Sequence, residues 1–135
     1  MNTNTYRIGD REQRPWGSWV VCDVMPTAVV KKIRVNSGCK LSYRRHQFRS
    51  ERWVVVEGIA TVIIDGSKST LAYGDTIEIP RMSLHRLMND SDSILVVIEV
   101  QYGTILSEED IERIEDDYSK CSQSETQTSD IQQPF

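Results

Sequence analysis

The stretch RRHQFRSERWVVVEG (residues 44–58) places a dense cluster of charged side chains directly before an apolar segment. Arg44, His46, Glu51 and Gly58 occur in it with the spacing Arg-x-His-x4-Glu-x6-Gly. Residues i and i+2 of a strand share one face, so the side chains of Arg44 and His46 are expected to point the same way. This segment has three possible interpretations: a metal site, an anion site or a solvated loop.

Short segments with alternating or valine-rich patterns surround this stretch and predict β-strands. They are Trp19–Asp23, Ala28–Val35, Trp53–Glu57, Ala60–Ile64, Ser69–Leu71, Thr76–Ile79 and Ile94–Val100. Turn signals separate them, and Asp65-Gly66 suits the positive φ values of a tight hairpin. Short strands at this spacing predict an all-β sandwich or barrel. The most apolar run, Ile94–Val100, is expected to be a central strand.

One helix is predicted after the last strand, over residues 107–118. Ser107 is a suitable N-cap, and Asp110 follows three residues later as a capping-box partner. The acidic first turn favours the positive end of a helix dipole. Apolar side chains then recur at helical spacing on one stripe: Ile111, Ile114 and Tyr118.

The length of 135 residues predicts one domain. We expect a flexible N-terminal segment at residues 1–13, a folded domain at residues 14–120 and a disordered tail at residues 121–135, which has almost no apolar content. The net charge of -4 argues against a general nucleic-acid binder. No segment approaches the roughly 20 apolar residues of a membrane span, and no signal peptide is expected.

The three cysteines, Cys22, Cys39 and Cys121, form no CxxC pair. Their odd number makes a disulfide framework or a structural zinc site unexpected. Reduced thiols in a cytoplasmic protein are therefore predicted, with Cys39 as a small buried apolar residue.

A second block of residues completes a pair of motifs. Gly74, Pro80, His85 and Asn89 have the spacing Gly-x5-Pro-x4-His-x3-Asn. Together with residues 44–58, this block resembles the paired motifs of the cupin superfamily. The resemblance implies a jelly-roll, double-stranded β-helix fold, in which strands far apart in sequence converge on one interior point.

A closer resemblance covers residues 14–118. The chain is similar to the C-terminal cupin domain of type II phosphomannose isomerases, which is fused behind a mannose-1-phosphate guanylyltransferase domain. The segments that carry the likeness are RPWGSW (14–19), VKKIRVNSGCKLS (30–42), HQFRSERWVVVEGIATV (46–62), IEIPRMSLHRLMN (77–89) and VIEVQYGTILSEEDIERIEDDY (97–118). The RPWG start and the last segment are specific, because generic cupins lack both.

This resemblance implies a sugar-phosphate isomerase that interconverts mannose 6-phosphate and fructose 6-phosphate for GDP-mannose and polysaccharide synthesis. The implied metal ligands are His46, Glu51 and His85, which suit Zn, Mn, Fe, Ni or Co. The implied catalytic residues are Arg49, Glu51 and Arg86, and the implied substrate-binding residues are Arg44, Arg49 and Arg113. A homodimer and a separate guanylyltransferase are the expected partners.

The sequence departs from the family's pattern at one ligand position. Arg44 stands where the family has a glutamine, and an arginine keeps its proton and cannot bind a metal. Arg44 is expected to pair with Glu51, to occupy the metal's place, or to bind substrate. Arg44 therefore leaves open a cupin that binds a sugar or sugar phosphate without metal or catalysis. An iron cupin of the dioxygenase kind also stays open, since His46, Glu51 and His85 resemble a facial triad.

Overall fold

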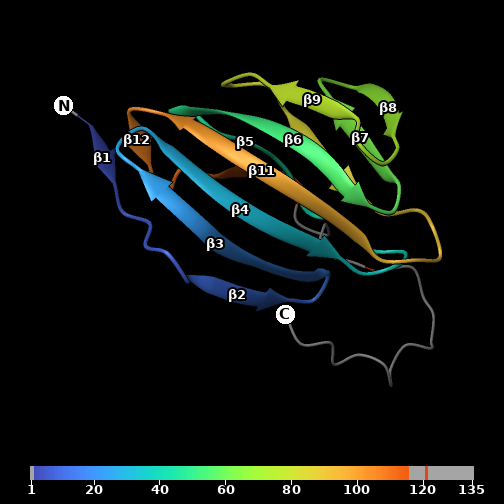
Figure 1. The fold of residues 1–135 in the computed structure, drawn as a ribbon. Helices are drawn as coiled ribbons and strands as arrows, with labels where there is room; N and C mark the ends of the chain where they lie inside the picture. Colours follow the sequence, from blue (N-terminus) through green and yellow to red (C-terminus); the bar gives the residue numbers. More distant parts are fainter. Residues whose placement is uncertain (1, 116–120, 122–135) are drawn as a thin grey trace.

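The computed structural model describes residues 2–115 and Cys121, and their main feature is two facing β-sheets (Figure 1). The six-stranded sheet has the order β2 (Arg11–Arg14), β3 (Gly17–Met25), β4 (Ala28–Val35), β11 (Leu95–Gly103), β6 (Arg49–Glu57), β9 (Thr76–Ile79). The five-stranded sheet has the order β13 (Glu112–Glu115), β5 (Tyr43–Arg45), β10 (His85–Met88), β7 (Ala60–Ile64), β8 (Ser67–Leu71). A short parallel pair joins β1 (Thr3–Asn4) to β12 (Ile105–Leu106).

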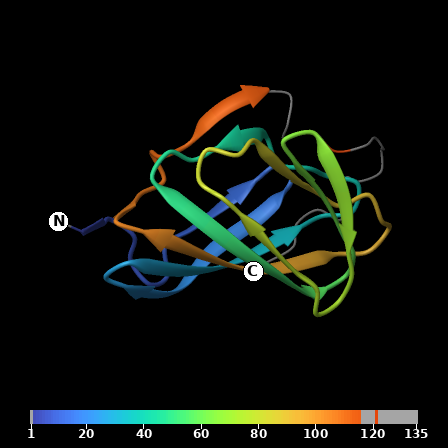
Figure 2. The same cartoon turned by 90° about the horizontal axis from the view of Figure 1, so that it is seen from above.

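The predicted all-β class and all seven predicted strands are confirmed. Alternation explains how the strands pack, as β4 shows. Val29, Lys31, Ile33 and Val35 are buried, while the residues between them are half-buried on the other face. Side chains from the inner faces of both sheets form one apolar core. Figure 2 shows the two sheets as opposite walls of the sandwich, with β13 (orange-red) at one edge.

Two turns hold the strands in register. Asp65 and Gly66 both have positive φ, 47° and 85°, as the predicted hairpin between β7 and β8 requires. Gly58 also has a positive φ of 85°, and a Cβ at this position would lie 2.3 Å from the carbonyl oxygen of Ile94. Only glycine therefore fits where the turn after β6 passes the start of β11.

The helix predicted for residues 107–118 is wrong over its described part, residues 107–115. Ser107 and Asp110 do form a turn, since the amide of Asp110 donates to the carbonyl of Ser107. The chain then extends as β13, which pairs with β5 and forms an ion pair between Glu112 and Arg45. These tertiary contacts override the local helix signals. The described residues contain no helix that could span a membrane.

Residues 2–13, within the segment expected to be flexible, are instead part of the fold. They contain β1 and most of β2, and Tyr6 is a buried core residue. At the other end, Cys121 forms a disulfide with buried Cys39, which corrects the prediction of reduced thiols for these two residues. Cys22 is a free, exposed thiol. The remaining residues of the predicted tail, 122–135, lie outside the described part of the chain.

Candidate functional site

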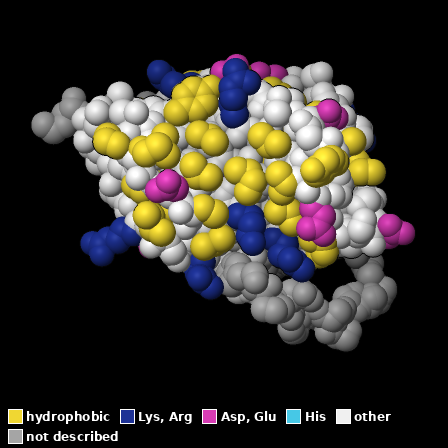
Figure 3. Space-filling view, viewed as in Figure 1, with side chains coloured by type: hydrophobic (Ala, Val, Ile, Leu, Met, Phe, Trp, Pro, Cys, Tyr) yellow, Lys and Arg dark blue, Asp and Glu magenta, His cyan; other side chains and the backbone are white. Residues whose placement is uncertain are grey.

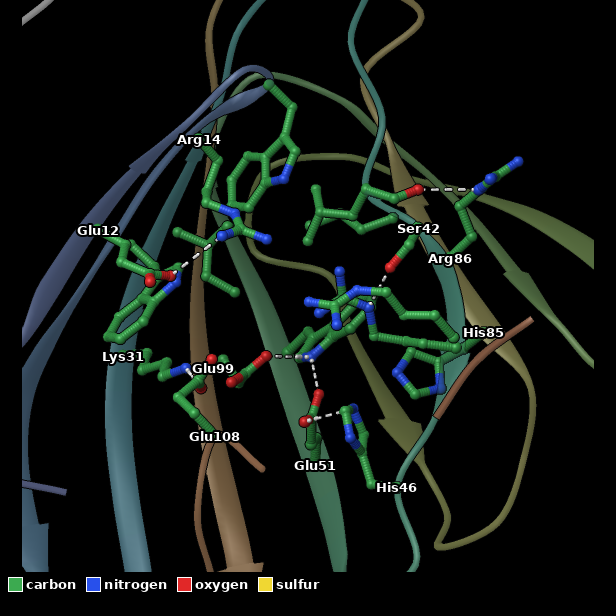
Figure 4. Close-up of a pocket in the computed structure, with 18 of the residues that line it drawn as sticks. Glu12, Arg14, Lys31, Ser42, His46, Glu51, His85, Arg86, Glu99 and Glu108 are labelled. Atoms are coloured by element: carbon green, nitrogen blue, oxygen red, sulfur yellow. Dashed lines mark hydrogen bonds and ion pairs between the residues drawn. The ribbon is translucent and has the colours of Figure 1, made fainter. Parts of the chain in front are cut away.

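The three implied metal ligands converge inside the sandwich. His46 follows β5, Glu51 lies on β6 and His85 begins β10, so two facing sheets supply them. One ligand atom from each residue lies within 4.8 Å of the others. All three side chains are buried, and His46 Nε2 lies 3.2 Å from Glu51 Oε2 (Figure 4). The spatial convergence expected from the motif spacing is therefore present.

Hydrogen bonds orient both imidazole rings. His46 Nδ1 lies 2.7 Å from the carbonyl oxygen of Asp110, and His85 Nδ1 lies 3.0 Å from the carbonyl oxygen of Ser83. A carbonyl only accepts, so each Nδ1 carries the proton and each Nε2 has a lone pair. In His46 this lone pair accepts from Arg49 Nη2 over 3.4 Å. Burial lowers the pKa of His46 to about 3 and lowers the pKa of His85 as well, so both rings are neutral at neutral pH.

The carboxylate of Glu51 is held by two donors. Arg49 Nε donates to Glu51 Oε2 over 2.8 Å, and Trp53 Nε1 donates to Oε1 over 2.9 Å. Burial alone would raise the pKa of Glu51, but the cationic Arg49 beside it holds that pKa well below its ordinary value. Glu51 is therefore ionised, and Arg49, rather than Arg44, is its ion-pair partner.

This donor set fits a divalent metal. Two neutral imidazole nitrogens and one carboxylate oxygen are the ligand types that zinc and the neighbouring transition metals prefer. Ligand bonds of about 2.1 Å at tetrahedral angles separate the ligand atoms by roughly 3.4 Å, close to the 3.2 Å between His46 and Glu51. The carbonyls that orient the two rings are also typical of histidines that bind metals. A metal held here would keep open positions for a substrate.

Arg44 lies beside this triad, between two other residues of its sheet. Its strand partners in register are His85 on β10 and Arg113 on β13, and all three line one cavity. Arg44 Nε donates to Ser42 Oγ over 2.8 Å. Burial and the nearby Arg113 lower the pKa of Arg44 to about 10. Two adjacent guanidinium groups repel each other, and an anion between them would relieve that repulsion.

Arg86 has a different orientation from the one its implied catalytic role requires. Its Nε donates to the carbonyl of Leu41 over 2.9 Å, and its side chain points away from Glu51 and His46 (Figure 4). The guanidinium also lies 5.9 Å from the ring centre of Tyr43. These contacts favour a structural role for Arg86.

The structure adds three site residues that the sequence reasoning missed: Lys31, Glu99 and Glu108. Lys31 on β4 lies opposite Glu99 on β11, and its ammonium group forms an ion pair with Glu108 and lies 3.8 Å from the ring centre of Trp19. Burial and the nearby Glu51 raise the pKa of Glu99 to about 7. Lys31 outweighs the effect of burial and lowers the pKa of Glu108 to about 2. One sequence signal could have identified Lys31 as a site residue. It is a charged residue at a strand position that alternation places on the inner face, between Val29 and Ile33.

All of these groups surround a cavity of about 230 Å³ between the sheets. Trp16 and Trp19 are buried and line it too. Its polar lining has two parts (Figure 4). One part contains side chains of both charge types: Glu12, Arg14, Lys31, Glu99 and Glu108. The other contains the triad with Arg44, Arg49 and Arg113.

Comparisons with known proteins agree with this geometry. A family model described as mannose-6-phosphate isomerase C-terminal matches residues 1–116. The chain is 42% identical over 110 residues to the alginate biosynthesis protein AlgA of Pseudomonas aeruginosa, covering 82% of this chain and 23% of that protein. It is 38% identical over 115 residues to a mannose-1-phosphate guanylyltransferase of Escherichia coli, covering 85% of this chain and 24% of that protein. The chain thus spans about a quarter of the length of these curated relatives.

A comparison with solved structures supports the two-sheet architecture described above. A double-stranded β-helix domain protein from Klebsiella pneumoniae matches with a TM-score of 0.63 and 18% identity, covering 72% of this chain and 78% of that one. At this identity the likeness shows the fold alone, and it confirms the predicted double-stranded β-helix of a cupin.

Proposed function

Because the chain belongs to the mannose-6-phosphate isomerase C-terminal family, we propose that it is a metal-dependent isomerase of mannose 6-phosphate and fructose 6-phosphate. The observation that carries this proposal is the buried triad, in which one ligand atom from each of two neutral imidazoles and one ionised carboxylate lies within 4.8 Å of the others. The reaction would serve GDP-mannose and polysaccharide synthesis, the setting in which the relatives named for alginate biosynthesis and mannose-1-phosphate guanylyl transfer are found.

In this proposal His46, Glu51 and His85 hold the metal, which when bound polarises the sugar oxygens at C1 and C2. Arg44 and Arg113 bind the phosphate, because two guanidinium groups at one wall of the cavity suit its doubly negative charge. The substrate then extends from this pair of arginines toward the triad. Both groups line the same cavity, so one sugar phosphate reaches both.

The isomerisation moves a proton between C1 and C2, and it needs a group that exchanges protons at neutral pH. Glu99 suits this role because its pKa is about 7 and it lines the cavity beside Lys31. Glu51 stays ionised, and Arg49 keeps it so by donating to Oε2. Arg49 is thus a positioning residue for the carboxylate, while Lys31 offers a hydrogen-bond donor to the sugar hydroxyl groups.

A second candidate function is a cupin that binds sugar phosphates without metal or catalysis. Two observations favour it. Arg44 carries a permanent charge at the position of the family's fourth ligand, beside His85. Both oxygens of Glu51 also accept hydrogen bonds from protein donors, so a metal has to share this carboxylate with Arg49 and Trp53.

One experiment separates the two functions. The protein is purified without added metal, its metal content is measured, and the metal-loaded protein is assayed with mannose 6-phosphate. About one divalent metal per chain together with formation of fructose 6-phosphate supports the isomerase. Stoichiometric metal without turnover refutes the substrate assignment. Absence of metal and of turnover, with a higher melting temperature in mannose 6-phosphate, supports the binding protein instead.

We further propose that a guanylyltransferase is the functional partner and that the setting is cytoplasmic, as for nucleotide-sugar synthesis. The support is the relative named mannose-1-phosphate guanylyltransferase, of which this chain matches about a quarter. Co-purification of a guanylyltransferase with the tagged full chain from its native host tests the partnership. Recovery of the chain without such a partner contradicts it.

A further inference from the structure

His46 depends for its orientation on a residue far away in the sequence. Its Nδ1 donates to the carbonyl oxygen of Asp110 over 2.7 Å, although the two residues are 64 positions apart. The Nδ1 of His85 instead meets the carbonyl oxygen of Ser83, which lies two positions away in the same segment. The backbone keeps a contact of this local kind by its own geometry. The contact of His46 lasts only if something holds the two segments together.

The carboxylate of Asp110 provides that connection. Its Oδ1 accepts from the amide of Gln47 over 2.8 Å, and its Oδ2 accepts from the amide of Phe48 over 2.9 Å. These two residues directly follow His46, so Asp110 contacts the segment through both carboxylate oxygens and through its own carbonyl. Hydrogen bonds to an ionised carboxylate are stronger than those between neutral groups. The side chain of Asp110 therefore fixes the distance between its carbonyl and the imidazole ring.

The turn that carries Asp110 is itself held against the site. The amide of Asp110 donates to the carbonyl oxygen of Ser107 over 3.1 Å and closes the turn. The same carbonyl accepts from Arg49 Nη1 over 3.1 Å, and Arg49 Nε donates to Glu51 Oε2 over 2.8 Å. One turn thus reaches two members of the triad, His46 directly and Glu51 through Arg49.

Burial makes the choice of partner strict for each imidazole. Both histidines are buried, and neither is visible on the face of the molecule in Figure 3, where histidine side chains would be cyan. A buried ring cannot replace a lost protein partner with bulk water, and an unpaired buried donor is costly. The protein itself therefore has to select which ring nitrogen carries the proton.

Two acceptors compete for the single ring proton of neutral His46. The carbonyl oxygen of Asp110 lies 2.7 Å from Nδ1, and Glu51 Oε2 lies 3.2 Å from Nε2. If the carbonyl moved away, the proton is expected to lie on Nε2 and to be donated to Glu51. A protonated Nε2 has no lone pair for a metal. The contact with Asp110 therefore decides whether His46 can bind a metal through Nε2.

We propose that Asp110 is a positioning residue of the metal site. Its carboxylate holds the segment after His46, so that the carbonyl of Asp110 accepts from Nδ1 and the lone pair of Nε2 stays available to a metal. This inference rests on the metal-binding role proposed above for His46 and deepens it. A carboxylate that only stabilised the fold would change the melting temperature, but neither the tautomer of His46 nor the metal affinity of the folded chain.

Nitrogen-15 NMR of the full chain without metal tests the tautomer. The chain has two histidines, so His85 serves as an internal reference for His46. Wild type is expected to carry the proton at Nδ1 in both rings at neutral pH. In Asp110→Ala the ring of His46 should be protonated mainly at Nε2, while His85 should keep its proton at Nδ1. Asp110→Asn retains one acceptor oxygen for the two amides, so it should give a mixture of both tautomers of His46.

Calorimetric titration with Zn²⁺ is the second measurement. Loss of an interaction that orients a ligand histidine costs about 10- to 100-fold in metal affinity, so the dissociation constant of Asp110→Ala should rise by about that factor. Asp75→Ala is the matched control. Asp75 Oδ2 accepts from the amide of Ala72 over 2.8 Å in a turn that does not line the cavity. This variant should melt at a lower temperature and bind Zn²⁺ as wild type does.

Circular dichroism verifies that each variant is folded, and Asp110→Asn carries the test if Asp110→Ala is not. A folded Asp110 variant whose His46 keeps its proton wholly at Nδ1 overturns the proposal. So does a loss of Zn²⁺ affinity in Asp75→Ala equal to that in Asp110→Ala. A wild-type chain that binds no Zn²⁺ counts against the metal-dependent isomerase, and the tautomer of His46 still decides the role of Asp110.

Discussion

Arg44 and His85 are direct partners in the register of strands β5 and β10, and Arg113 is the partner of Arg44 on its other side. A permanent cation thus lies next to an imidazole that is neutral and has a free Nε2 lone pair. The family resemblance implies a glutamine at this position. If the proposed function holds, this relationship sets the balance between the site's affinity for a metal cation and its affinity for a phosphate anion.

Replacing Arg44 by glutamine should raise the affinity for a divalent metal and lower the affinity for a sugar phosphate. Arg44→Gln removes a positive charge from beside the triad and supplies an amide oxygen, so the affinity for Zn²⁺ or Mn²⁺ should rise by about tenfold or more. Affinity for mannose 6-phosphate should fall by a similar factor, since one phosphate-binding guanidinium is lost. Calorimetric titration with metal and with sugar phosphate measures both. Arg45→Gln is the control, because Arg45 is a half-buried partner of Glu112 and lies outside the cavity lining. Equal effects of the two variants would contradict this role of Arg44.

Truncating His85 should remove metal and activity together. His85→Ala leaves only His46 and Glu51 as protein ligands, and the metal content of the purified protein should fall to less than about a tenth of wild type. The measurement is metal analysis beside the isomerase assay. Ser83→Ala keeps the backbone carbonyl that orients the imidazole of His85 and serves as the control. Full metal content in a folded His85→Ala protein would remove His85 from the ligand set.

Stability should depend on pH through Glu99. Its pKa is raised from 4.5 to about 7, chiefly by burial. The folded state therefore resists ionisation of Glu99, and the protein loses stability as the pH rises from about 4.5 through 7, by roughly 3 kcal/mol in all. Glu99→Gln is neutral at every pH and removes this loss.

The free energy of unfolding in urea is measured for Glu99→Gln and for wild type at about pH 4.5 and about pH 8. The stability of the variant relative to wild type should increase between these two pH values by up to about 3 kcal/mol. Glu109→Gln is the control, because Glu109 is exposed. A difference between Glu99→Gln and wild type that stays constant over this range would show that Glu99 titrates as an ordinary carboxylate.

Reduction should weaken the fold through the disulfide between Cys39 and Cys121, which joins residues separated by 82 positions. Closing a loop of that length limits the unfolded chain and stabilises the fold by up to about 4 kcal/mol. Dithiothreitol should lower the free energy of unfolding of wild type by an amount in this range. Cys22→Ser should show the same loss, since Cys22 is free, whereas Cys39→Ser should show none. A wild-type chain equally stable with and without reductant would contradict the prediction.

Local pattern was enough to predict most of the fold. The strands Ala28–Val35 and Thr76–Ile79 agree with the structure residue for residue, because alternation and turn residues act within a few positions. The resemblance to the paired cupin motifs implied that His46, Glu51 and His85 lie together, and the structure has them in one buried cluster. The short strands β5, β10 and β13 have too few residues for a pattern, and they form because their neighbours in the sheet pair with them.

The sequence by itself determined an all-β sandwich, because side-chain alternation and turn chemistry are local properties of the chain. Its resemblance to the paired cupin motifs implied two histidines and a glutamate on converging strands. Only the tertiary structure decided that Arg49 rather than Arg44 pairs with Glu51, that Lys31 and Glu99 face the cavity, and that residues 112–115 form a strand. Each of these depends on contacts between residues far apart in sequence. Their free energies come from register, burial and neighbouring charge, which no local pattern contains.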